Sequence, residues 1–121
     1  MCGFAGIARR DARGQGVSPA TLRRMAAAIQ HRGPDAYGHA ADRDAGIGLR
    51  HRRLAIIDLT PAGAQPMRSR DGRWLLASNG EIYNFQDLRK DLERDGVRFR
   101  GHSDTEVTLA EGTLFHRNLS P

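Results

Sequence analysis

The first thirty residues predict a strand followed by a helix. Residues 3–9 carry small and apolar side chains and predict a short buried strand, and residues 10–17 form a polar, glycine-containing loop. Ser18 stands directly before Pro19, and this pair favours a helix start because proline tolerates the first helical position and a serine hydroxyl accepts from the free amides. The apolar face expected for this helix consists of Leu22, Met25, Ala26 and Ile29.

The middle of the chain has three segments whose apolar residues predict strands. These segments are residues 47–49, 54–57 and 74–78. The run at 54–57 is continuously apolar, which is typical of a buried strand. Residues 60–66 contain two prolines and a glycine and predict a loop, and Asn79-Gly80 predicts a tight turn after the third strand.

Two helices and a short strand are predicted toward the C-terminus. Asn84 is placed to cap the first helix, and Gly96 follows its end. Residues 97–99 predict a short strand. Ser103 and Glu106 have the spacing of a capping box, which predicts the start of a second helix. Strands and helices mixed with short links indicate an α+β fold.

Composition narrows the class of protein. The chain has 121 residues, of which 39% are hydrophobic and 27% charged, so it is ordinary globular material of one domain at most. Cys2 is the only cysteine, which excludes an intramolecular disulfide and a four-cysteine zinc site and favours a cytoplasmic location. No apolar run reaches the length of a membrane span, and the first arginines follow the N-terminal apolar stretch, the wrong order for a secretory signal. We expect no membrane partner.

The net charge of +5 raises the question of a nucleic-acid partner. The positive charge is nearly all arginine and is spread along the chain, with one dense cluster at residues 50–53. No nucleic-acid-binding motif and no stacking aromatics accompany that cluster. An arginine-rich solvated surface explains the charge better, and we expect no nucleic acid to bind.

Cys2 is the first candidate for chemistry. Removal of Met1 would make it the N-terminal residue, with a thiol and a free amine on the same residue. The amine has an ordinary pKa of about 8 and the thiol of about 8.5, so the two can exchange a proton at neutral pH. One residue would then supply both nucleophile and base. A cysteine at position 2 more often has no catalytic role, so the motifs along the chain have to support one.

Cys2 begins the first of five ordered motifs. They are Cys2-Gly3-Phe4-Ala5-Gly6-Ile7, His31-Arg32-Gly33-Pro34-Asp35, His51-Arg52-Arg53-Leu54-Ala55-Ile56-Ile57-Asp58 with Gly63-Ala64-Gln65-Pro66 behind it, Asn79-Gly80-Glu81-Ile82-Tyr83-Asn84, and Ser103-Asp104-Thr105-Glu106-Val107. Together they resemble the class II glutamine amidotransferases, whose nucleophile is an N-terminal cysteine (Ntn type). The Pro-Asp ending of the second motif and the full fourth motif favour the asparagine synthase branch, and the third motif matches the same branch. The resemblance covers residues 2–111.

The resemblance implies a fold and a domain organisation. Such a glutaminase domain is a four-layer αββα sandwich with two antiparallel sheets and the nucleophile on the first strand. Residues 2–111 would be its N-terminal portion, with the second sheet incomplete. Residues 112–121 do not follow the family pattern and are expected to be a non-matching tail. The synthetase domain of the family is also absent. Because the strands that complete the second sheet would be missing, the apolar face of the first sheet would be exposed, and we expect the isolated chain to be poorly folded or to depend on a partner.

The resemblance also implies catalytic roles. Cys2 would attack the side-chain amide of glutamine and form a thioester. The negative oxygen that develops needs donors already in place, and the side-chain NH₂ of Asn79 and the backbone N–H of Gly80 would supply them. Without the resemblance, Asn79-Gly80 is simply a tight turn.

Five further residues would bind the glutamine. Arg53 would hold its α-carboxylate with the two-pronged guanidinium, and Glu81 and Asp104 would hold its α-ammonium group. Ile56 and Ile57 complete the implied glutamine site. Arg53 can also be one surface arginine among several, and Asp104 an acid in the first turn of a helix. His31 and Asp35 are expected to order a loop, Ser103 to act as a cap, and no role is assigned to His51 or His102.

The implied function is hydrolysis of glutamine to glutamate and ammonia. In the family's full-length asparagine synthase, the ammonia supports asparagine synthesis from aspartate, glutamine and ATP. The hydrolysis itself requires no cofactor or metal, because ATP and magnesium belong to the absent synthetase domain. The partners expected are glutamine and a synthetase domain or subunit that accepts the ammonia. The alternative is a truncated, inactive remnant or interaction module.

Overall fold

A computed structural model of the chain describes residues 1–10 and 16–119. The chain forms two compact units. Unit 1 comprises Met1–Ala55, Ala64–Pro66 and Ala77–Gly80, and unit 2 comprises Ile56–Gly63, Met67–Leu76 and the residues from Glu81 onward. Antiparallel sheets and α-helices confirm the α+β class. Within the described ranges, no helix is both long and apolar enough to cross a membrane.

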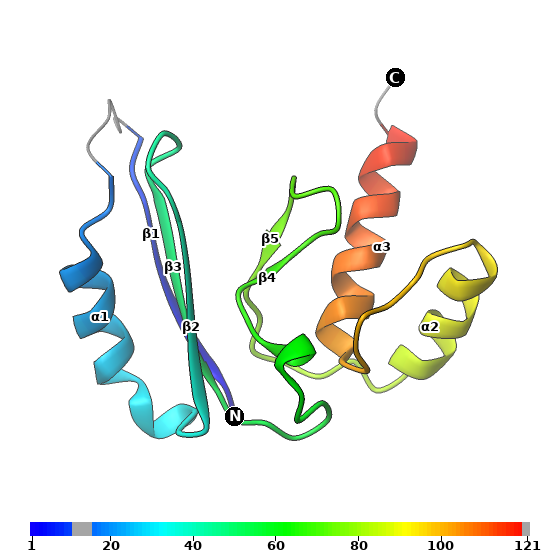
Figure 1. Ribbon diagram of the computed structural model, residues 1–121, viewed down its shortest axis with the longest axis horizontal. Helices are drawn as coiled ribbons and strands as arrows, with labels where there is room; N and C mark the ends of the chain where they lie inside the picture. Colours follow the sequence, from blue (N-terminus) through cyan, green and yellow to red (C-terminus); the bar gives the residue numbers. More distant parts are fainter. Residues whose placement is uncertain (11–15, 120–121) are drawn as a thin grey trace. The chain divides into compact units, whose positions relative to one another are not determined.

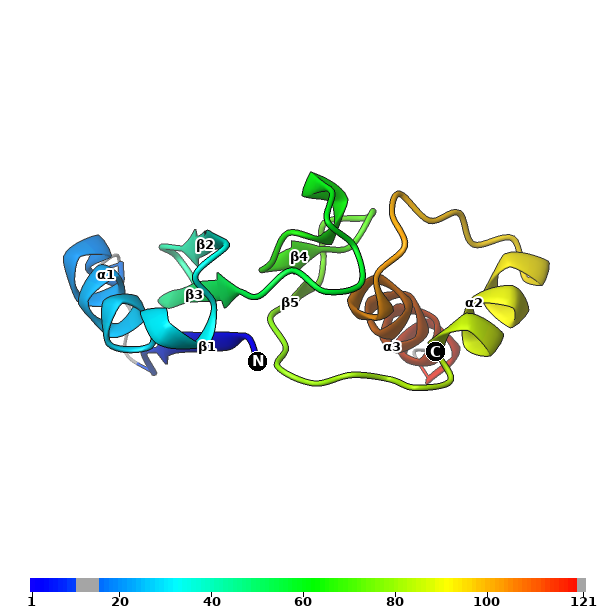
Figure 2. The same ribbon diagram turned by 90° about the horizontal axis from the view of Figure 1, so that it is seen from below.

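Unit 1 is a three-stranded antiparallel sheet with a helix along one face (Figures 1 and 2). Its elements are β1 (Gly3–Ala8), α1 (Pro19–Ala28), η1 (Gln30–Arg32), β2 (Ala36–Asp42) and β3 (Ile47–Arg53). The strand order is β1-β3-β2, with Gly3 opposite Arg52 and Ala36 opposite Arg53. The predicted strand at 3–9 is therefore confirmed to within one residue.

Helix α1 begins where the sequence predicts. The Ser18 hydroxyl accepts from the Thr21 amide at 3.4 Å and caps the helix. Leu22 and Ala26 are buried, as expected of the apolar face. Gly48 of β3 lies directly under this helix, since an added Cβ would come within 2.6 Å of the Leu22 side chain. The absence of a side chain at Gly48 is what lets helix and sheet approach so closely.

Unit 2 contains a short two-stranded hairpin and two helices that pack together (Figure 1). Its elements are η2 (Pro61–Gly63), β4 (Met67–Arg68), β5 (Leu75–Leu76), α2 (Phe85–Arg94) and α3 (Asp104–Leu119). Its buried apolar residues are Met67, Leu92, Val107 and Leu109. The predicted cap is present, because the Ser103 hydroxyl accepts from the Glu106 amide at 3.2 Å. The Glu106 carboxylate accepts from the Gly101 amide at 2.9 Å.

Two predicted strands are wrong. Residues 54–57 form no strand, and Ile56 and Ile57 are 62% and 43% exposed. Strand β3 ends at Arg53 because the next two amides bind side chains, Leu54 to the Cys2 sulfur and Ala55 to the Asp35 carboxylate. Residues 97–99 also form no strand. There the Val97 amide donates to the Leu92 carbonyl at 2.9 Å and closes the end of α2.

Other strands differ in extent. Of the strand predicted at 74–78, only β5 forms. The Ser78 amide donates to the Gln65 side chain at 2.7 Å instead of to a neighbouring strand. Strands β2 and β4 were not predicted. The helix predicted from Ser103 continues past Glu111 to Leu119.

Gly33 holds a close backbone approach that a substitution should disrupt. An added Cβ would lie 2.5 Å from the Arg52 carbonyl oxygen and 2.6 Å from the Arg53 nitrogen, and backbone atoms cannot easily move away. We expect Gly33→Ala to lower the free energy of unfolding in urea by about 1–3 kcal/mol. Gly112→Ala is the matched control, because a Cβ there meets nothing within 4 Å and alanine favours a helix. Equal free energies of unfolding in urea for the two variants would contradict the close approach.

Candidate active site

Cys2 lies immediately before β1, at the end of the sheet where β3 finishes. Its half-buried thiol faces the backbone of Leu54: the Leu54 amide donates to Sγ at 3.3 Å, and Sγ lies 3.5 Å from the Leu54 carbonyl oxygen. The Leu54 N–H therefore points at the sulfur atom of the candidate nucleophile. The departure of the chain from β3 at Leu54 thus creates a donor for the candidate nucleophile.

The Asn79 side chain reaches the same residue. In the amide orientation that satisfies both of its neighbours, Nδ2 donates to the Cys2 carbonyl oxygen at 3.0 Å and Oδ1 accepts from the Arg32 guanidinium at 3.1 Å. An amide NH₂ carries two hydrogens, so Nδ2 keeps a second one to donate. Asn79 and Cys2 lie far apart in the sequence, and unit 1 brings them into contact.

Arg32 was missed as a site residue. Its Nε donates to the Cys2 carbonyl oxygen at 3.1 Å, while its Nη2 binds Asn79. One guanidinium therefore ties the candidate nucleophile to the candidate oxyanion donor. Its position inside the second motif was the available signal, but a single arginine in a chain with nineteen Lys and Arg does not stand out from sequence alone.

Arg53 and Gly80 also belong to unit 1. Arg53 is the last residue of β3 and is half-buried, and its carbonyl accepts from the Asp35 amide at 3.1 Å. The Asp35 carboxylate accepts from the Ala55 amide at 2.9 Å, so Asp35 orders this loop as expected, whereas His31 is exposed. Gly80 is exposed, and the space where a side chain would stand is open for 4 Å.

The other four predicted residues belong to unit 2. Ile56, Ile57 and Glu81 are exposed and lie outside helices and strands. Asp104 is the first residue of α3 and is 8% exposed. Its carboxylate accepts from the Ile82 amide at 3.1 Å and the Thr105 amide at 2.8 Å. Asp104 thus acts as a helix-start acid and fixes the segment next to Glu81, and the glutamine-binding roles of all four residues stay predictions.

His51 is the fully buried titratable group of unit 1. Burial lowers the pKa of its imidazole from the ordinary 6.5, the hydrogen bond to the Ser78 carbonyl opposes this, and the Arg53 charge lowers the pKa further. The net direction is downward. The folded protein therefore holds His51 neutral at a pH where the unfolded chain already binds a proton.

This shift makes stability depend on pH. As the pH falls below about 6.5, the unfolded chain binds a proton at His51 before the folded chain does. The stability that the folded state has above that pH is therefore lost progressively, until the pH falls below the lowered pKa of His51 in the folded state. We expect the free energy of unfolding in urea to decrease as the pH falls below about 6.5, by about 1.4 kcal/mol for each unit by which the pKa is lowered. His51→Gln should remove this part of the slope. An identical slope in the variant would show that His51 does not cause it.

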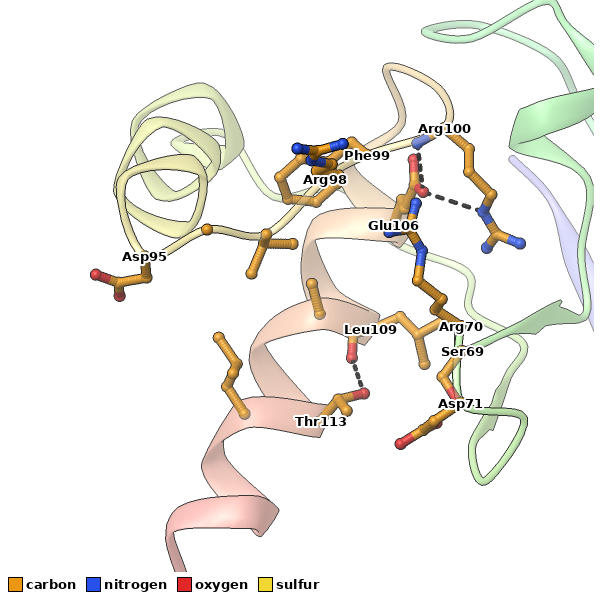
Figure 3. Close-up of a pocket in the computed structure, with 14 residues that line it drawn as sticks. Ser69, Arg70, Asp71, Asp95, Arg98, Phe99, Arg100, Glu106, Leu109 and Thr113 are labelled. Carbon is orange, nitrogen blue, oxygen red and sulfur yellow. Dashed lines mark hydrogen bonds and ion pairs between the residues drawn. The ribbon is translucent and has the colours of Figure 1, made fainter.

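The cavity of Figure 3 is not the predicted site. It has a volume of about 380 Å³ and lies in unit 2, between the loop after α2, residues 106–114 of α3 and residues 69–71. None of the eight predicted site residues lines it. Its buried acid, Glu106, is already bound by the amides of Arg100 and Gly101. Among the residues that the structure describes, no three His, Cys, Asp or Glu side chains cluster closely enough to hold a metal ion.

Comparison with known proteins agrees with the motifs. A family model described as a glutamine amidotransferase domain matches residues 1–115. Asparagine synthetase (glutamine-hydrolyzing) 1 of Bacillus subtilis is 42% identical over 111 residues, 91% of this chain and 17% of that protein. Asparagine synthetase B of Escherichia coli is 46% identical over 82 residues, 68% of this chain and 14% of that protein. Amidase chry2 of Gibberella zeae is 42% identical over 82 residues, 68% of this chain and 12% of that protein.

The chain thus spans less than a fifth of the length of these relatives. The family match, in contrast, covers nearly all of it and includes every motif quoted above. The chain belongs to the glutamine amidotransferase domain family, of the type found in glutamine-hydrolysing asparagine synthetases.

Proposed function

We propose that this chain hydrolyses glutamine to glutamate and ammonia with Cys2 as the nucleophile. The observation that carries the proposal is the contact between Cys2 and Asn79, whose amide nitrogen lies 3.0 Å from the Cys2 carbonyl oxygen. A nucleophile and a donor with a spare hydrogen are thereby adjacent within unit 1. The names of the relatives, which describe glutamine hydrolysis, support the choice of substrate.

In the first step the Cys2 sulfur attacks the side-chain carbonyl carbon of glutamine. The α-amine of Cys2 accepts the thiol proton, and the carbonyl oxygen becomes an oxyanion. The free hydrogen of Asn79 Nδ2 and the Gly80 N–H donate to that oxyanion. The carbon–nitrogen bond then breaks, the amine returns its proton to the leaving nitrogen, and ammonia departs from a thioester. Because the base is the α-amine, Met1 has to be removed first.

Water completes the reaction. The α-amine of Cys2 takes a proton from the water, whose oxygen attacks the thioester carbonyl carbon. The same donors stabilise the second oxyanion, the carbon–sulfur bond breaks, and the sulfur regains a proton as glutamate leaves. The Leu54 amide, 3.3 Å from Sγ, stabilises sulfur as an anion at that moment.

Recognition of glutamine is assigned to charged side chains. Arg53 ends the strand next to Cys2 and would bind the α-carboxylate, where a planar guanidinium can donate two parallel hydrogen bonds. Glu81 and Asp104 would bind the α-ammonium group, and Ile56 and Ile57 would contact the substrate. The motif match supports the roles of these last four.

We further propose that the ammonia passes to a synthetase domain or subunit, as the names of the relatives suggest. ATP and magnesium would act there and not in glutamine hydrolysis. The cytoplasm suits this chemistry because it keeps the Cys2 thiol reduced. The alternative function is that of an inactive remnant or interaction module.

A glutaminase assay on the purified chain with Met1 removed decides between these functions. The enzyme is expected to release glutamate and ammonia steadily from glutamine, and to release no ammonia from asparagine. A folded chain with a cooperative melt and no release would favour the interaction module instead. The far-UV spectrum and melting curve of the same sample distinguish this case from an unfolded chain.

A further inference from the structure

His51 is a buried polar residue to which the proposed reaction gives no role. It lies in β3, the central strand of unit 1, opposite Phe4 of β1 and Gly38 of β2. Its side chain is fully buried. A polar ring in such a position requires a hydrogen bond to offset its desolvation.

The hydrogen bond of His51 goes to the segment that carries Asn79. His51 Nε2 lies 3.3 Å from the Ser78 carbonyl oxygen, and a carbonyl oxygen only accepts. The hydrogen therefore resides on Nε2, and Nδ1 is the bare nitrogen. Among the described residues, the buried Nδ1 has no hydrogen-bond partner. Among the residues that the structure describes, the ring thus makes one hydrogen bond, and its partner is Ser78.

Ser78 is held from its other side as well. Its amide donates to the Gln65 side-chain oxygen at 2.7 Å. The Gln65 backbone in turn packs against β2 at Gly38, where any Cβ would overlap the Gln65 carbonyl oxygen. Residues 77–80 pair with no strand, so these two side chains hold both backbone groups of Ser78 in place of a ladder. Asn79 follows directly.

We propose that His51 is a positioning residue for glutamine hydrolysis: its Nε2–H fixes the Ser78 carbonyl and thereby places the Asn79 amide beside Cys2. The inference rests on the proposed function, because it gives Asn79 the oxyanion. A donor that is about 1 Å out of place can lose about 100-fold in rate, so the backbone before Asn79 has to be held firmly. Substrate binding does not depend on this placement.

The test compares two substitutions at His51 in the full 121-residue chain. His51→Gln keeps a donor at nearly the position of Nε2, and His51→Leu fills the space without one. We expect His51→Leu to lower kcat by about tenfold or more with KM changed by less than about twofold, and His51→Gln to restore most of kcat. His39→Leu, the same change at an exposed histidine of β2, should leave both constants unchanged.

Two outcomes would overturn the proposal. One is an unchanged kcat in His51→Leu, and the other is equal losses of kcat in the leucine and glutamine variants. Melting temperatures of all three variants accompany the kinetics. A structural role alone would lower the melting temperature of His51→Leu and its concentration of active enzyme, without a change in kcat per active site titrated by Cys2 alkylation.

A second readout is independent of activity. Nitrogen NMR should show the His51 ring protonated at Nε2, and the two Asn79 side-chain amide hydrogens should have distinct, single resonances. These resonances should shift or broaden in His51→Leu and return in His51→Gln. If the wild-type chain hydrolyses no glutamine, the proposed function fails, and the NMR still decides whether His51 holds Asn79. Unaltered Asn79 resonances in His51→Leu would overturn the positioning role even in an active enzyme.

Discussion

Replacement of Cys2 by alanine is expected to reduce glutamine hydrolysis to the background of the assay. The substitution removes the only thiol of the chain, and with it the atom that forms the thioester. No other cysteine can take over the attack. The measurement is release of glutamate from glutamine, followed at enzyme concentrations high enough to detect a residual rate. Mass spectrometry of the wild-type chain quenched during turnover should show the acyl adduct on Cys2, and Cys2→Ala should show none.

Blocking the α-amine of Cys2 should abolish hydrolysis as completely as removing the thiol. In the structure Met1 precedes Cys2 and is 75% exposed, so it is accessible for removal. A preparation that retains Met1, or one acetylated after its removal, keeps the thiol but lacks the amine that accepts its proton. Both should be inactive, while their melting temperatures match that of the active preparation. Activity with a blocked N-terminus would rule out the amine as base and require another proton acceptor.

Local signals predicted the elements that begin with recognisable caps. Ser18 and Ser103 each accept from an amide three residues ahead, as their sequences indicate, and the helices start there. These predictions succeed because a cap depends on residues that are close in the chain. Gly96 likewise follows the end of α2 with φ of +89°, a conformation that glycine adopts without strain.

Strand boundaries failed where side chains compete for backbone donors. The apolar run at 54–57 predicts a strand by composition, yet Cys2 and Asp35 take the amides of Leu54 and Ala55. Strand β2 was missed for the opposite reason. Its residues, from Ala36 to Asp42, include only one residue with high β-propensity, Tyr37, and pairing with β3 sets its conformation.

The candidate site was predictable only through the family resemblance. Asn79-Gly80 by itself indicates a turn, and nothing local shows that the Asn79 side chain contacts Cys2. Arg32 and His51 reach carbonyl groups 30 and 27 residues away. Such contacts depend on how β1, β3 and the segment 77–80 come together, which a hydrophobic pattern does not encode.

Replacing Asn79 by alanine and replacing Arg53 by alanine should change different kinetic constants. Asn79→Ala should lower kcat by about 10²–10³-fold, or about 3 kcal/mol, because its spare hydrogen serves the oxyanion, which exists only along the reaction. Arg53→Ala should mainly raise KM, because the α-carboxylate is bound equally in the ground state and the transition state. Steady-state kinetics on both variants separates the two roles.

Binding measured without turnover makes this contrast sharper. In a Cys2→Ala background, calorimetry reports the affinity for intact glutamine, to which an oxyanion donor contributes little. Asn79→Ala should leave that affinity nearly unchanged, whereas Arg53→Ala should reduce it, since a charge-assisted pair typically contributes about 1.5–3 kcal/mol. Asn79 also contacts Cys2 and Arg32, so a matching melting temperature is needed to exclude a general loss of structure. If Asn79→Ala weakens binding while Arg53→Ala slows turnover, the two roles are exchanged: Asn79 would then hold the substrate, and the charge of Arg53 would stabilise the oxyanion.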